Sequence, residues 1–123
     1  MQYILNGSLM TSSNYDWNLD AHPIGSTGAS LSQGYGTYIT VDVGYASNTT
    51  DEEAGYTFRI YNARHNAFKY VIWQGGSLGY GSRRTSIGQG IYNAGENSDM
   101  TGVRFFTSSG NIRGTFRLYG LVK

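Results

Sequence analysis

The chain has 123 residues, no cysteine, and nine basic against eight acidic side chains. A chain of this length fits a single domain, residues 1–123, with a core that needs no disulfide or metal. The net charge is near zero, whereas a nucleic-acid binder usually carries a clustered basic surface. No segment approaches the roughly 20 apolar residues of a membrane span. We therefore expect no nucleic-acid partner, no membrane partner and no cofactor.

The first half of the chain predicts three strands from apolar residues that recur with a period of two. In residues 2–10 (QYILNGSLM), Tyr3, Leu5 and Leu9 fall on one parity. In residues 15–20 (YDWNLD), Tyr15, Trp17 and Leu19 do the same. Residues 21–36 are rich in glycine and serine, and we interpret them as a long connection with room for one short edge strand. Residues 37–46 (TYITVDVGYA) alternate clearly and predict a strong strand.

The second half predicts two hairpins. After an acidic loop, residues 56–76 read as a hairpin whose apolar positions are Phe58 and Ile60 on one arm and Phe68, Tyr70 and Ile72 on the other. Residues 77–99 are glycine-rich, and they predict only weak strands near Ser86 to Tyr92. Residues 100–123 predict a closing hairpin with a short polar, glycine-containing turn.

The closing arm has the most regular alternation in the chain. From Ile112 onward the even positions include Phe116 and Leu118, which predicts that these two side chains lie in the core. The odd positions would point outward, and arginine and tyrosine are enriched at the buried centres of protein interfaces. We therefore expect a contact surface made of the closing strand and an arginine pair in a glycine-rich loop, with Arg83, Arg84, Arg113, Arg117 and Tyr119 as partner-binding residues.

About eight short strands, uneven loops and no helical pattern predict the fold class. It is an all-β, antiparallel two-sheet β-sandwich, and a jelly roll is the favoured version. The regular final strand would close one of the two sheets.

The closing arm also resembles the end of a group of bacteriophage virion proteins, whose chains finish with a Gly-Thr-(Ile/Phe)-Arg-Leu-Tyr-Gly strand. The matching segment is Gly114 to Gly120, and the resemblance covers about the last fifth of the chain. It implies a jelly-roll-like module located in the virion, as in capsid surface proteins, tail fibres and receptor-binding tips. It implies no catalytic residue.

Motifs that carry chemistry have simpler interpretations. GGSLGYG (75–81) is not followed by Gly-Lys-Ser/Thr, so we interpret its glycines as turn residues. His22 and His65 accompany no nucleophile motif, and the acidic residues 51–53 lack calcium-loop spacing. We therefore expect no catalytic or metal site. The many tyrosines could stack on sugars, although strand alternation places about half of such residues between the sheets.

These observations predict a non-enzymatic structural protein of a bacteriophage. A single module without a shaft segment favours a capsid decoration, or cement, protein that binds the major capsid protein or other virion proteins on the assembled shell. Small modules of this kind often trimerise, so we expect a homotrimer. The alternative is a receptor-binding tail-fibre or tail-tip module that contacts host surface carbohydrate.

Overall fold

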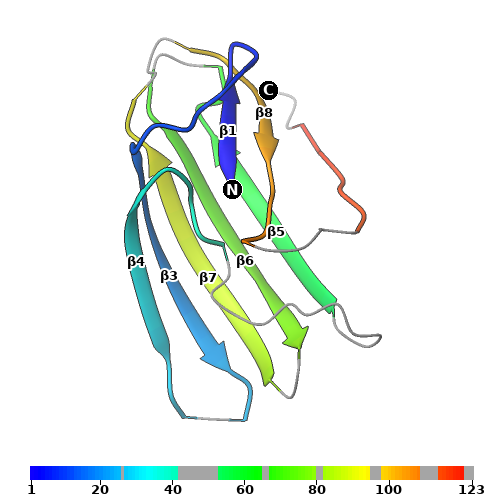
Figure 1. Cartoon of the computed structure of the whole chain (residues 1–123). Helices are drawn as coiled ribbons and strands as arrows, with labels where there is room; N and C mark the ends of the chain where they lie inside the picture. Colours follow the sequence, from blue (N-terminus) through cyan, green and yellow to red (C-terminus); the bar gives the residue numbers. More distant parts are fainter. Residues whose placement is uncertain are drawn as a thin grey trace.

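The computed structural model describes residues 1–25, 27–41, 53–64, 67–79, 82–94, 98–108 and 114–120. Within these ranges the chain is all-β, with two antiparallel sheets and no helix (Figure 1). The described residues therefore include no helix that could cross a membrane.

The larger sheet has five strands in the order β4-β3-β7-β6-β5. Its members are β3 (Tyr15–Pro23), β4 (Ser30–Gly36), β5 (Glu53–Tyr61), β6 (Lys69–Gly79) and β7 (Ser82–Tyr92). The smaller sheet has three strands in the order β2-β1-β8. Its members are β1 (Gln2–Leu5), β2 (Ser8–Leu9) and β8 (Met100–Arg104). Strand β1 lies in front of the larger sheet in Figure 1.

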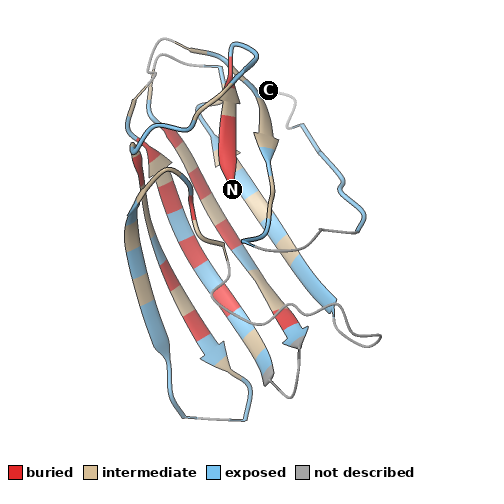
Figure 2. Ribbon diagram, in the orientation of Figure 1, coloured by how far each residue is buried: buried red, intermediate tan, exposed pale blue. Residues whose placement is uncertain are grey.

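The core lies between the two sheets. Alternate residues of β3, β6 and β7 are buried on the face toward β1, as the banding of these strands in Figure 2 shows. Trp73 is 1% exposed, and its Nε1 donates a hydrogen bond to the carbonyl oxygen of Val41 at 3.0 Å. The buried apolar cluster comprises Met1, Tyr3, Leu5, Tyr15, Leu19, Ile39, Val71, Trp73 and Tyr92. Four of these nine residues are aromatic, so large rings are a major part of the packing between the sheets.

The N-terminal segment forms a hairpin, whereas its sequence predicted one strand. Asn6 and Gly7 have φ angles of 47° and 80°, and strands β1 and β2 pair on either side of them. Asn-Gly is the favoured sequence for a two-residue hairpin turn, because both positions need positive φ. The prediction followed the apolar parity of residues 3–9 and overlooked this turn.

Strand β7 differs most from its prediction, because it is an 11-residue strand at the centre of the larger sheet. A Cβ on Gly88 would lie 2.5 Å from Cε2 of Trp73, and one on Gly90 would lie 2.7 Å from Cδ1 of Ile39. The glycines that made this strand look weak thus leave room for large core side chains of other segments. Likewise Gly75 to Gly79 belong to β6, so the turn interpretation of residues 75–81 is wrong over these five residues.

The hairpin of β5 and β6 confirms the prediction for residues 56–76, but one arm faces the other way. Phe58 pairs with Trp73 and Ile60 pairs with Val71, so β6 turns its odd residues toward the core. Phe68, Tyr70 and Ile72 do not belong to the buried core cluster. Both parities of β6 carry apolar residues, and alternation alone could not choose between them.

Residues 37–41 are not in a strand, although their sequence predicted one; residues 42–46 lie outside the described ranges. Ile39 is nevertheless fully buried, and its backbone hydrogen-bonds both ways with Met1. The Met1 amine donates to the Ile39 carbonyl at 2.6 Å, and burial lowers the pKa of this amine to about 5. Burial also raises the pKa of Tyr15 to about 12.

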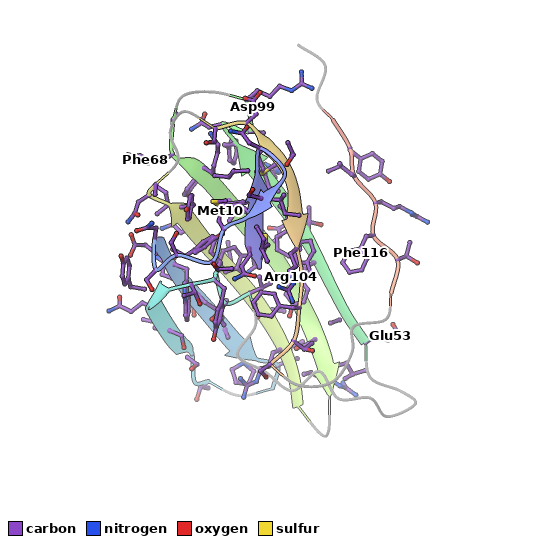
Figure 3. All side chains as sticks on the ribbon, turned by 45° about the horizontal axis from the view of Figure 1, so that its top comes forward. Met10, Glu53, Phe68, Asp99, Arg104 and Phe116 are labelled. Carbon is purple, nitrogen blue, oxygen red and sulfur yellow. The ribbon has the colours of Figure 1, made fainter. Side chains whose placement is uncertain are left out.

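The structure also contradicts the predicted closing strand. Residues 114–120 belong to neither sheet, and the first arm of the expected hairpin, β8, pairs with β1. Leu118 is 94% exposed and Phe116 is 66% exposed, so neither is a core residue. Phe116 turns back toward the sheets (Figure 3), and its ring stacks on Phe105 with centroids 5.6 Å apart. This ring contact ties an otherwise exposed segment to the core.

Candidate binding surface

The five residues predicted to bind a partner do not form one stripe. Arg83 and Arg84 are successive residues of β7, so they point to opposite faces of the larger sheet, Arg83 exposed and Arg84 half-buried. They lie in a strand and not in the expected loop. Arg117 and Tyr119 belong to the C-terminal segment outside both sheets, where both are exposed. Arg113 lies outside the described residues.

The structure instead gathers polar and aromatic side chains on the outer face of the larger sheet, the face turned away from β1. Strand pairing aligns one residue from each strand into a row across this face. The first row, called here the tyrosine row, runs from β4 to β5 through Tyr35, Asp16, Ile91, Tyr70 and Tyr61. Tyr35 is 63% exposed, and the rings of Tyr61 and Tyr70 lie 5.8 Å apart.

The next row, called here the amide row, lies beside the tyrosine row. It consists of Gln33, Asn18, Gln89, Ile72 and Arg59 in the same strand order. The hydroxyl of Tyr70 hydrogen-bonds to Oε1 of Gln89 at 2.6 Å, which links the two rows. Asn93 Nδ2 donates to Asp16 Oδ2 at 2.9 Å and holds this carboxylate near the start of β3.

Two shallow depressions follow these rows. The first, of about 600 Å³, includes Tyr35, Tyr70, Asp16, Asn18 and Gln89 in its lining. The second, of about 730 Å³, shares Asn18, Gln33 and Gln89 with the first and adds Leu31, Asp20, Ile72 and Ile87 to its lining. Because they share residues, the two depressions form one continuous surface over β4, β3, β7 and β6.

The charges on this face are few and of both signs. Asp16 and Asp20 lie on β3, while Arg59 and Arg83 lie on β5 and β7. His22 Nε2 is 3.0 Å from Asp20 Oδ2, so a protonated His22 would form an ion pair with it. Among the described residues, no group of three His, Asp or Glu side chains is placed to hold a metal ion. The surface is therefore suited to a ligand that is bound by stacking and by neutral hydrogen bonds.

Sequence reasoning missed this surface because glycine hid the alternation. In β4 the outward residues Leu31, Gln33 and Tyr35 are separated by Ser32 and Gly34, and a Cβ on Gly34 would lie 2.7 Å from Cε2 of Trp17. Because the inward-facing positions of β4 hold small residues, its sequence shows no apolar period. The signal that could have found the surface is the run of large polar and aromatic residues at alternate positions.

The fold and this surface define an all-β protein of two antiparallel sheets whose larger sheet carries tyrosine and amide side chains on its outer face. Comparisons of the chain with protein-family models, with curated proteins and with solved structures found no match.

Proposed function

We propose that this chain is a non-enzymatic structural protein of a bacteriophage particle, and that it decorates the assembled capsid. The observation that carries the proposal is the C-terminal segment Gly114 to Gly120. It holds the virion-like Gly-Thr-Phe-Arg-Leu-Tyr-Gly sequence, yet it extends outside both sheets (Figure 1). Its Phe116, Leu118 and Tyr119 side chains are exposed.

Such a segment is suited to adding to another protein. An exposed patch of apolar and aromatic side chains favours burial against a partner. An extended segment with alternating side chains can add to the edge of a neighbouring sheet, where its backbone groups form a ladder and its apolar side chains enter pockets. The smaller sheet ends at β8, which pairs with β1 alone among the described strands. A fourth strand at this edge would give sheets of four and five strands, close in size to the two sheets of the expected jelly roll.

The same segment supports the expected homotrimer. If each copy gives its segment to the next copy, the contact is heterologous, and it closes into a ring of three where the rotation between copies is one third of a turn, which would bury all three segments. The partner on the particle would then be the major capsid protein or another virion protein, bound through the outside of this ring. In this arrangement Arg117 and Tyr119 lie on the parity opposite to Phe116 and Leu118 and remain available for that contact.

A pull-down with empty expanded capsids of the encoding phage tests this proposal, with isolated capsid subunits and host cells in parallel. We expect retention on capsids and none on subunits, and the double variant Phe116→Ser/Leu118→Ser should abolish it. Ile24→Ser is the matched control, because Ile24 is an exposed apolar residue just beyond β3. Retention on host cells without retention on capsids would contradict decoration.

The alternative is a receptor-binding module of the tail, and the tyrosine and amide rows favour it. Copy number separates the two positions. Particle stoichiometry in the hundreds, relative to the major capsid protein, supports decoration, and a few to a few tens of copies support the tail.

A further inference from the structure

We propose that the outer face of the larger sheet is a binding site for a neutral oligosaccharide. In this site Tyr35 and Tyr70 stack on sugar rings, while Asn18, Gln33 and Gln89 bind hydroxyl groups. The inference does not rest on the position of the chain in a virion, because it uses only residues of β3, β4, β6 and β7. The site is also separate from the C-terminal segment.

The first argument is the pairing of flat rings with side chains that both donate and accept hydrogen bonds. A pyranose ring presents C–H groups on its faces and hydroxyls around its edge, so it needs an aromatic platform beside neutral polar groups. The tyrosine and amide rows are adjacent on the same sheet, so they supply these two features side by side. The hydrogen bond between Tyr70 and Gln89, at 2.6 Å, fixes one ring next to one amide in advance of binding.

The second argument is the spacing along the row. Tyr35 and Tyr70 are separated by Asp16 and Ile91 and therefore by three strand spacings. At about 4.8 Å per spacing, their backbones are about 14 Å apart. Two platforms at this separation contact different rings of one chain and cannot share a single monosaccharide. The first depression, which both tyrosines line, lies along this path. The second lies beside it and shares Asn18, Gln33 and Gln89 with the first.

The third argument concerns charge and excludes other occupants. Asp16 and Asp20 lie in the lining of the two depressions, and no lysine or arginine is among their lining residues. Arg59 and Arg83 lie on the same face but outside both depressions, so an anionic glycan or a nucleic acid seated in them would meet these carboxylates with no cation in the lining. A second copy of the chain is also disfavoured, because charged residues are depleted at the centres of protein interfaces and the carboxylates of Asp16 and Asp20 lie within this face.

Affinity electrophoresis tests the proposal directly. The protein is run in native gels that contain dextran, galactomannan, arabinoxylan or laminarin as neutral probes, and alginate or heparin as anionic ones. We expect at least one neutral polysaccharide to retard the protein and neither anionic one to do so. Retardation by the anionic probes alone, or by none of the six, would overturn the proposal.

Variants locate the site. Tyr35→Ala and Gln89→Ala should each weaken retardation by about three- to tenfold, the worth of one stacked ring or one hydrogen bond. Both side chains are exposed, so the variants should keep the wild-type melting temperature. The matched control is Tyr38→Ala, an exposed tyrosine whose ring packs on Phe106 away from this face. Equal loss in Tyr38→Ala would place binding elsewhere and overturn the proposal.

Two further measurements separate this site from the proposed function and from self-association. Tyr35→Ala should still bind expanded capsids, and Phe116→Ser/Leu118→Ser should still be retarded by the neutral polysaccharide. If neither the wild type nor any variant binds capsids, the decoration proposal is wrong and the proposed glycan site is unaffected. Sedimentation velocity of the wild type and Tyr35→Ala completes the set. If the wild type is a dimer, Tyr35→Ala is a monomer, and no polysaccharide retards the wild type, the face binds a second copy and the glycan proposal is overturned.

Discussion

Gly88 offers the sharpest test of how the core is packed. Replacing it with alanine adds one Cβ on the inner face of β7, 2.5 Å from Cε2 of Trp73 and 2.8 Å from the carbonyl oxygen of Asn18. Trp73 cannot yield easily, because it is almost fully buried and its Nε1 is bonded to the Val41 carbonyl. The tryptophan ring or the β7 backbone must therefore shift.

The expected cost combines two effects. Overpacking a core by one methyl group costs about 1–3 kcal/mol, and losing the Trp73 hydrogen bond adds about 1 kcal/mol. At roughly 4 °C per kcal/mol for a domain of this size, Gly88→Ala should lower the melting temperature by roughly 8–16 °C. Urea unfolding followed by tryptophan fluorescence measures the same loss as a free energy of unfolding.

A matched glycine provides the control. A Cβ on Gly55 in β5 would meet no atom within 4 Å, so Gly55→Ala should leave stability unchanged or raise it by up to about 1 kcal/mol. In a double-mutant cycle, Trp73→Phe should make Gly88→Ala less costly, because the smaller ring gives way. Equal melting temperatures for Gly88→Ala and Gly55→Ala would refute this account of the core.

Two more predictions concern the ends of the chain. Because Leu118 is exposed, Leu118→Ala should change the free energy of unfolding by no more than about 0.5 kcal/mol. Leu19 is buried, so Leu19→Ala should cost about 2–5 kcal/mol. A loss at Leu118 as large as at Leu19 would place the C-terminal segment in the core. The buried Met1 amine has its pKa lowered from 8.0 to about 5, so the unfolded chain binds more protons in this range. The free energy of unfolding should therefore rise from pH 5 to pH 8, and this contribution of the amine should be lost as the pH falls through the same range. Urea titrations in which the free energy of unfolding decreases with rising pH would contradict burial of this amine.

Some elements could be predicted because their alternation involves large side chains on one parity only. Strand β3 is of this kind, with Tyr15 and Leu19 buried and Asp16 and Asn18 outside. The β5–β6 hairpin was also predicted, although its second arm is apolar on both parities and was assigned the wrong face. The two-sheet, all-β architecture followed from such segments together.

Other elements could not be predicted because what decides them lies elsewhere in the chain. Strand β7 lacks an apolar period because Gly88 and Gly90 occupy inward positions, where Trp73 and Ile39 from other segments fill the space beside them. Residues 114–120 have a clear period, but a period shows only that a segment is fit to pair and does not supply a partner strand. The outer-face surface arises only when pairing brings Tyr35 of β4 and Tyr70 of β6 into one row.

The position of β7 also has a consequence for the order of folding. Strands β5, β6 and β7 pair with their neighbours in sequence, so this meander closes only short loops. The ladder between β3 and β7 instead joins Tyr15 to Tyr92 and Pro23 to Arg84, which requires most of the chain to be gathered first. Closing so long a loop carries an entropic cost that the contacts offset only late. The β5–β7 meander should therefore form early and the β3–β4 hairpin should dock onto it last, so that until then β7 is an uncovered edge on which a second nascent chain could pair.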